Sequence, residues 1–160
     1  MSEETYVRRL KGTPLPSLRT LRESLQEEER QVSYWRRLVQ GRLDLVRAGL
    51  EGKPPNPIDL ARLAARRERA GDARRSPAST HLSATGVTSP LGGVEALWDT
   101  PIPWQHLANL AEAERALVET EVELSVYRRV LHQRIDLCTA ELVERYQRDP
   151  SQLAMVMLPT

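Results

Sequence analysis

Two long segments of the chain repeat hydrophobic residues at steps of three and four, the period of one face of a helix. The first segment runs from Leu18 to Leu50 without a proline, and the second runs from Trp104 to Asp149 without glycine or proline. Helices of this length are stabilised by packing lengthwise on a partner. The pattern predicts an all-α fold: a long antiparallel helical hairpin or coiled coil, with a short additional helix and a flexible connection. The predicted seam residues are Leu18, Leu21, Leu25, Val32, Trp35, Val39, Leu43, Val46, Leu107, Leu110, Leu117, Leu124, Tyr127, Leu131, Ile135, Cys138 and Leu142.

Prolines and polar capping residues predict where these segments begin and end. Ser17, after two prolines, is placed to cap the first long helix, and Thr100 and Pro101 are placed to open the second. The stretch 72–100 is rich in Ser, Thr, Gly, Pro and Ala without a clear period, so we expect it to be mobile. The predicted parts are a lead-in (1–16), a first long helix (17–50), a linker (51–100) with a short helix over about 57–70, a second long helix (101–149) and a tail (150–160).

A set of five polar residues occurs once on each long segment, at a constant offset of 92 residues. The shared pattern is E-x3-S-x2-R-x3-[QH]-x3-D, and its steps keep all five side chains within about 80° of one helix face. A heptad repeat explains matching apolar positions but not a repeated Ser, Arg and Asp, so the repeat indicates a duplicated segment. The two sets are Glu29, Ser33, Arg36, Gln40 and Asp44, and Glu121, Ser125, Arg128, His132 and Asp136.

The helical wheel places each polar set at the margin of the apolar seam. One set spans 15 residues, or about 22 Å of helix, which is more than a metal ion or a small metabolite requires. An arginine fork can hold a phosphate or the O6/N7 edge of guanine, and a carboxylate can accept from the N1–H and amino groups of guanine. The pattern therefore favours a ligand with repeated guanines and phosphates. Arg37 and Arg129, which follow the motif arginines, are candidates for additional phosphate contacts.

The motif on two paired helices resembles the RsiG-type anti-sigma factors of actinobacteria. The resemblance implies that the ten motif residues bind a dimer of cyclic di-GMP, and that the ligand holds a WhiG-type sigma factor of the flagellar and sporulation class in a heterodimer. The first copy matches the family motif at every position, whereas the second has His132 in place of glutamine. No sequence signature marks the sigma contacts; Trp98 and Trp104, which we expect to be exposed, and the short helix from Pro57 are candidates.

Composition narrows the class of protein. Charged residues make up 28% of the chain and aromatic residues 4%, with no Phe, which suits a helical seam better than a thick core. The net charge of +1, the single Cys138 and the absence of a long apolar run lead us to expect a cytoplasmic protein that binds neither membrane nor nucleic acid directly. No catalytic or metal-binding pattern is present, so we expect neither an enzyme nor a metal protein.

Two other functions remain open from the sequence. A coiled-coil adaptor without a small ligand would retain the repeat as a trace of duplication. A DNA-binding regulator would use the arginine-rich stretch 62–75, although a solvated helix face is the more common role of such a stretch. Trp35 and Tyr127 occupy the same repeat position on the apolar side, so we expect them to pack in the seam rather than stack on a base.

Overall fold

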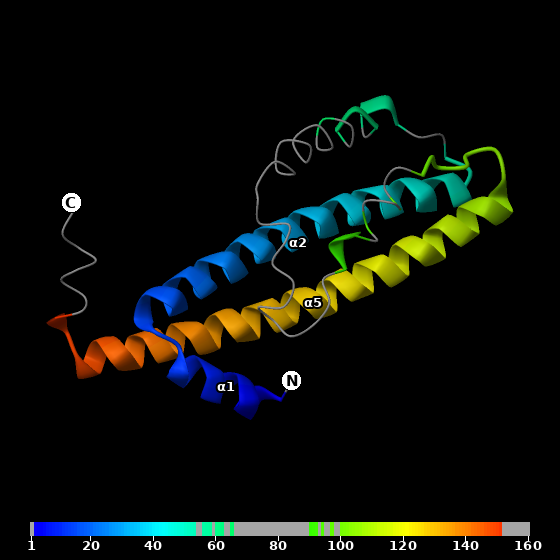
Figure 1. Cartoon of the computed structure of the whole chain (residues 1–160). Helices are drawn as coiled ribbons and strands as arrows, with labels where there is room; N and C mark the ends of the chain where they lie inside the picture. Colours follow the sequence, from blue (N-terminus) through cyan, green and yellow to red (C-terminus); the bar gives the residue numbers. More distant parts are fainter. Residues whose placement is uncertain are drawn as a thin grey trace.

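The computed structural model describes residues 2–53 and 100–151, together with 56–58, 60–62, 65, 90–92, 94 and 97. Two long helices, α2 (Leu15–Leu50) and α5 (Leu107–Arg148), lie antiparallel along each other, and a short helix, α1 (Glu3–Gly12), packs on α5 (Figure 1). These described residues include no β-strand. The predicted all-α hairpin is confirmed.

The seam between α2 and α5 follows a strict seven-residue spacing. Side chains at this spacing return to the same line along a helix that coils around a partner, which keeps the line in contact along its full length. All members of the two lines are at most 2% exposed. They are Leu18, Leu25, Val32, Val39 and Val46 on α2, and Leu110, Leu117, Leu124, Leu131 and Cys138 on α5.

Helix α1 was not predicted, because residues 1–16 were interpreted only as a lead-in to the first long helix. The Ser2 hydroxyl caps its first turn by accepting from the backbone N–H of Thr5 at 3.3 Å. One short face, Tyr6 and Leu10, is buried, which is too small a pattern to stand out in a sequence. At the other end the guanidinium of Arg145 donates to the backbone carbonyls that end α1, those of Leu10, Lys11 and Thr13, at 2.8, 3.0 and 2.6 Å.

Both long helices begin at positions other than those predicted. Helix α2 begins at Leu15, with Pro16 in its first turn, so Ser17 lies inside the helix and does not cap it. Helix α5 begins only at Leu107, and residues 101–106 form an irregular segment before it. Trp104 in this segment packs against Gly49, where a Cβ atom would lie 3.3 Å from the Trp104 ring. The half-buried Trp104 is therefore a packing residue, and its predicted exposure is wrong.

The connection between the helices is described only in part. Residues 57, 58, 60–62 and 65 are helical and exposed, in agreement with the predicted short helix. Leu91, Gly92, Val94 and Leu97 are helical as well, and Val94 is buried in the hairpin core at 1% exposure. This part of the 72–100 stretch, which we expected to be mobile, is therefore helical and packs on the hairpin through Val94. Residues 66–89, including most of the arginine-rich stretch, together with Trp98 and the tail from 152, lie outside the described residues.

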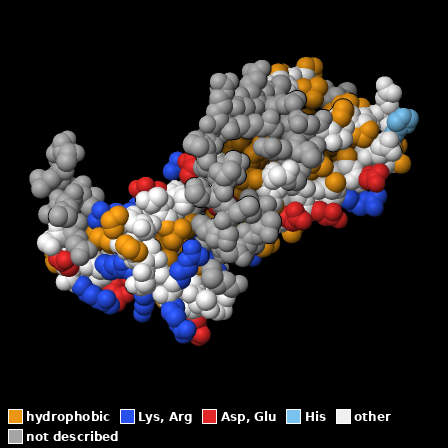
Figure 2. Space-filling model, in the orientation of Figure 1, with side chains coloured by type: hydrophobic (Ala, Val, Ile, Leu, Met, Phe, Trp, Pro, Cys, Tyr) orange, Lys and Arg blue, Asp and Glu red, His pale blue; other side chains and the backbone are white. Residues whose placement is uncertain are grey.

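The visible surface carries charges of both signs. On the face drawn in Figure 2, basic side chains gather with a few acidic ones at the end of the hairpin near α1, and acidic side chains with a basic one lie toward the other end. None of the described helices combines the length and apolarity needed to cross a membrane.

Candidate ligand-binding site

The motif residues of α2 and α5 meet across the margin of the seam. The Nε atom of Arg36 on α2 donates to Oε1 of Glu121 and to Oγ of Ser125 on α5, both at 2.8 Å. The Nε atom of Arg128 on α5 donates to Oε1 of Glu29 at 2.9 Å and to Oγ of Ser33 at 2.8 Å on α2. Each motif arginine therefore contacts the acidic residue and the serine of the opposite copy.

The fourth motif position completes the same arrangement on both sides. Gln40 donates from Nε2 to Oε1 of Glu121 at 3.1 Å, and Nε2 of His132 lies 3.1 Å from Oε1 of Glu29. The serines donate within their own helices, Ser33 to Glu29 at 2.7 Å and Ser125 to Glu121 at 3.0 Å. Two four-residue groups result. The Glu29 half-site is Glu29, Ser33, Arg128 and His132; the Glu121 half-site is Glu121, Ser125, Arg36 and Gln40.

The two half-sites are related by an approximate twofold axis. Exchanging each motif residue for its counterpart 92 positions away turns every contact of one half-site into a contact of the other. The stretches that make these contacts contain Trp35 on α2 and Tyr127 on α5, the pair at equivalent repeat positions. Both rings are buried, at 8% and 4% exposure, so their predicted role in the seam is confirmed. The Tyr127 hydroxyl donates to Oε1 of Glu28 at 2.5 Å.

Partial burial and hydrogen bonding fix the charge of the Glu29 half-site. Burial alone raises the pKa of Glu29, but hydrogen bonds from Ser33, Arg128 and His132 and the charge of Arg128 outweigh it. The pKa of Glu29 therefore lies below its ordinary value. The carboxylate stays ionised at neutral pH and can hold the Arg128 guanidinium in one orientation.

The arginines are anchored at one nitrogen and open at the others. Among the described residues, Nε is the only atom of Arg36 or Arg128 with a hydrogen bond or an ion pair. The side chains are 31% and 39% exposed, so the terminal NH2 groups are accessible to a ligand. The acidic and serine partners orient each guanidinium, and its bidentate edge remains free.

The structure brings together eight of the ten predicted motif residues and leaves the two aspartates outside the network. Asp44 and Asp136 lie one helical turn beyond Gln40 and His132 and are exposed. Neither makes a hydrogen bond or an ion pair within the described part of the chain. The same holds for the exposed Arg37 and Arg129. These four ionised side chains are available to a ligand on either side of the half-sites.

One repeated residue has a role that the sequence did not reveal. Arg42 and Arg134 are identical in the two copies and are both 8% exposed. Arg42 donates from Nη2 to the backbone carbonyl of Thr100, and this hydrogen bond holds the segment before α5 against α2. The Arg134 guanidinium lies 4.0 Å from the centre of the Tyr6 ring, and this cation–π contact holds α1 against α5. Their repetition was the available signal, but their burial could not be read from the pattern.

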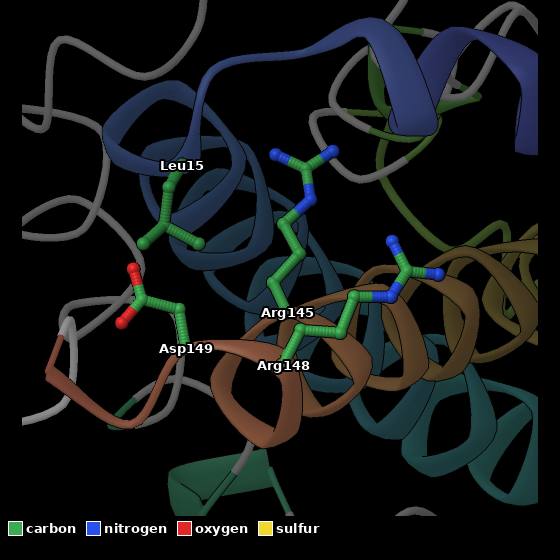
Figure 3. Close-up of a pocket in the computed structure, with 4 residues that line it drawn as sticks. All are labelled: Leu15, Arg145, Arg148 and Asp149. Carbon is green, nitrogen blue, oxygen red and sulfur yellow. The ribbon is translucent and has the colours of Figure 1, made fainter.

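A separate hollow lies at the end of the hairpin where α5 ends (Figure 3). It encloses about 350 Å³ and is lined by Leu15, Arg145, Arg148 and Asp149. Both arginines already have acidic partners, since Arg145 pairs with Glu141 at 2.7 Å and Arg148 pairs with Glu144. The hollow is therefore a weaker candidate than the two half-sites. No group of three or more potential metal ligands occurs in the described residues.

Comparison with known proteins identifies the family. A family model described as RsiG-like matches residues 4–67 and 105–158. The chain belongs to the RsiG-like family. The matched segments contain both motif copies, and membership supports a role as an anti-sigma factor with a sigma factor as partner. Searches of curated proteins and of solved structures gave no significant match.

Proposed function

We propose that this protein is a cytoplasmic anti-sigma factor, without enzymatic activity, that binds a dimer of cyclic di-GMP on the two half-sites. With the ligand in place it sequesters a WhiG-type sigma factor of the flagellar and sporulation class and keeps the genes of that factor silent. A fall in cyclic di-GMP releases the sigma factor. Family membership supports the anti-sigma role, and the geometry of the half-sites supports the ligand.

The twofold arrangement of the half-sites is the observation that carries this proposal. The same contacts occur twice, each between an arginine of one helix and the glutamate and serine of the other. A ligand with two equivalent halves matches such a surface better than an asymmetric metabolite does. Cyclic di-GMP has two guanines and two phosphates in equivalent positions, and a symmetric pair of these molecules has four of each, related by a twofold axis.

The free edges of the arginines are suited to this ligand. A guanidinium held at Nε can use its terminal nitrogens for a bidentate contact with a phosphate or with O6 and N7 of guanine. Because Glu121 and Ser125 already restrain Arg36, less side-chain entropy is lost on binding than for a free arginine. Glu29 and Ser33 provide the same restraint for Arg128.

The exposed aspartates and the second arginines supply the remaining chemistry. The carboxylates of Asp44 and Asp136 can each accept two parallel hydrogen bonds from the N1–H and amino groups of a guanine. Two cyclic di-GMP molecules bring four phosphate charges, which Arg36, Arg37, Arg128 and Arg129 can offset. Binding a charged ligand pair on one face of the hairpin also changes the surface presented to sigma, so the two affinities must rise together.

Calorimetric titration of cyclic di-GMP into the protein, with and without a WhiG-type sigma factor, tests the proposal. We expect two ligands per chain and a much tighter affinity when sigma is present. Absence of binding in both titrations would contradict the ligand assignment. It would favour a ligand-free coiled-coil adaptor, the alternative supported by the fact that the eight networked residues already satisfy one another across the seam.

A further inference from the structure

The two helices are equivalent at the ligand positions but differ on their solvent-facing sides next to them. Val122 and Val126 on α5 are 53% and 52% exposed. Their counterparts on α2 are Arg30, which pairs with Glu27 at 2.5 Å, and Tyr34, which packs edge-on against the Trp35 ring. The outer edge of α5 is therefore apolar where the matching edge of α2 is not.

Unpaired carboxylates border the two valines. Glu119 and Glu123 are exposed and lie three residues before Val122 and Val126, on the adjacent part of the helix surface. Neither glutamate has a hydrogen bond or an ion pair among the residues that the structure describes. Figure 2 shows acidic side chains next to hydrophobic ones along the part of α5 that is yellow in Figure 1. We call Glu119, Val122, Glu123 and Val126 the α5 edge patch.

The α5 edge patch is continuous with the candidate ligand site. Val122 directly follows Glu121, and Val126 directly follows Ser125, so the patch adjoins the Glu121 half-site around the helix. A symmetric ligand bound to two equivalent half-sites presents the same surface in two orientations. An asymmetric partner protein would dock equally well in either orientation. An apolar and acidic edge on one helix alone removes that ambiguity.

We propose that the sigma factor docks on the α5 edge patch through a helix that presents aliphatic side chains flanked by lysine or arginine. The aliphatic side chains cover Val122 and Val126, and the basic residues pair with Glu119 and Glu123. That the partner is a sigma factor rests on the proposed function. The aliphatic and basic character of its docking helix is inferred from the valines and glutamates of the patch itself.

The test measures binding of the full-length protein to an immobilised WhiG-type sigma factor at saturating cyclic di-GMP. The double variant Val122→Gln/Val126→Gln retains helix propensity and removes the apolar contact. We expect its affinity for sigma to fall by about 100-fold, in the range of central interface residues. The charge variant Glu119→Lys/Glu123→Lys should weaken sigma binding as well, with a slower association rate at low salt.

Two matched controls isolate the patch. Val143→Gln alters a valine of α5 that is 46% exposed but lies 17 residues beyond Val126, and Arg30→Gln alters the equivalent edge of α2. Both should bind sigma like the unmodified protein. The proposal would be overturned if the valine variant bound sigma with an affinity within twofold of that of the unmodified protein. It would also be overturned if Arg30→Gln lost as much sigma affinity as the valine variant.

Two further measurements keep this proposal separate from the proposed function. Cyclic di-GMP is titrated into the valine variant without sigma, and its heat should match that of the unmodified protein. If the unmodified protein binds sigma but not cyclic di-GMP, the ligand assignment fails, and the valine variant still decides the docking surface. Sedimentation shows whether the patch instead joins two copies of this chain, and a dimer that the valine variant dissociates would overturn sigma as its occupant.

Discussion

The Glu29 and Glu121 half-sites share every contact and differ at one residue. In the Glu121 half-site the fourth position is Gln40, and in the Glu29 half-site it is His132, each with Nε2 at 3.1 Å from the glutamate. The two half-sites therefore contact the glutamate through different groups, a neutral amide in one and an imidazole nitrogen in the other. The duplication has kept the contact and changed the residue that makes it.

Comparing the two motif copies also shows which motif positions keep the same residue and which accept another. Each motif arginine contacts two residues of the opposite helix from a single nitrogen, and no other side chain offers this planar geometry with free terminal donors. The fourth position makes one hydrogen bond at the exposed rim, which several polar side chains can form. Arginine is retained in both copies, and the rim residue differs.

The largest expected effect follows from replacing the motif arginines. Arg36→Lys and Arg128→Lys keep the charge but leave one ammonium in place of a guanidinium, so no bidentate edge remains once the glutamate is contacted. Each variant should lose about 100-fold in cyclic di-GMP affinity by calorimetry, or about 2.7 kcal/mol. Arg30→Lys is the control, because Glu27 is the one partner of Arg30 among the residues that the structure describes. A large loss in only one of the two variants would show that the half-sites are not equivalent.

The aspartates should have a large effect on ligand binding and none on folding. In Asp44→Asn and Asp136→Asn one carboxylate oxygen becomes a donor, which removes the pair of acceptors that a guanine requires. We expect about 10- to 100-fold weaker binding in each, consistent with the loss of hydrogen bonds to a charged group. Thermal unfolding should be unchanged within about 0.5 kcal/mol, because neither side chain has a partner among the described residues. Normal ligand affinity in both variants would remove the aspartates from the site.

The hairpin was predictable because its seam is a regular seven-residue pattern over most of both helices. The seam-margin location of the eight networked residues followed from the same period. The cross-helix pairing was not predictable, because Arg36 contacts Glu121 rather than Glu29 only in the register that packing selects. Helix α1 was missed because its buried face consists of only Tyr6 and Leu10. Both depend on contacts between distant segments, which a local pattern does not encode.

Exchanging the residue at the rim should have a small effect on ligand binding. In His132→Gln both half-sites carry glutamine at the fourth position, and its amide can donate to Glu29 as Gln40 donates to Glu121 at 3.1 Å. We expect its affinity for cyclic di-GMP by calorimetry to stay within about fivefold of that of the unmodified protein, the value of one neutral hydrogen bond. A much larger loss would show that the imidazole itself contacts the ligand.

The smallest expected effect concerns the stability of the ligand-free protein in acid. The pKa of Glu29 in the folded protein lies below its ordinary value of 4.5, so its contacts stabilise the fold above that pH. This contribution is lost as the pH falls through the lowered pKa. Because the Glu29 side chain is 19% exposed and its partners are more exposed, we expect only about 0.5–1 kcal/mol.

Urea unfolding between pH 6 and pH 3 measures this contribution. Glu29→Gln should lose less stability over that interval than the unmodified protein, because its amide does not titrate. His132→Ala retains the carboxylate but lacks one of the three hydrogen bonds that lower the pKa of Glu29, so its loss should be intermediate. A Glu29→Gln variant as acid-sensitive as the unmodified protein would mean that the charged Glu29 network does not stabilise the hairpin.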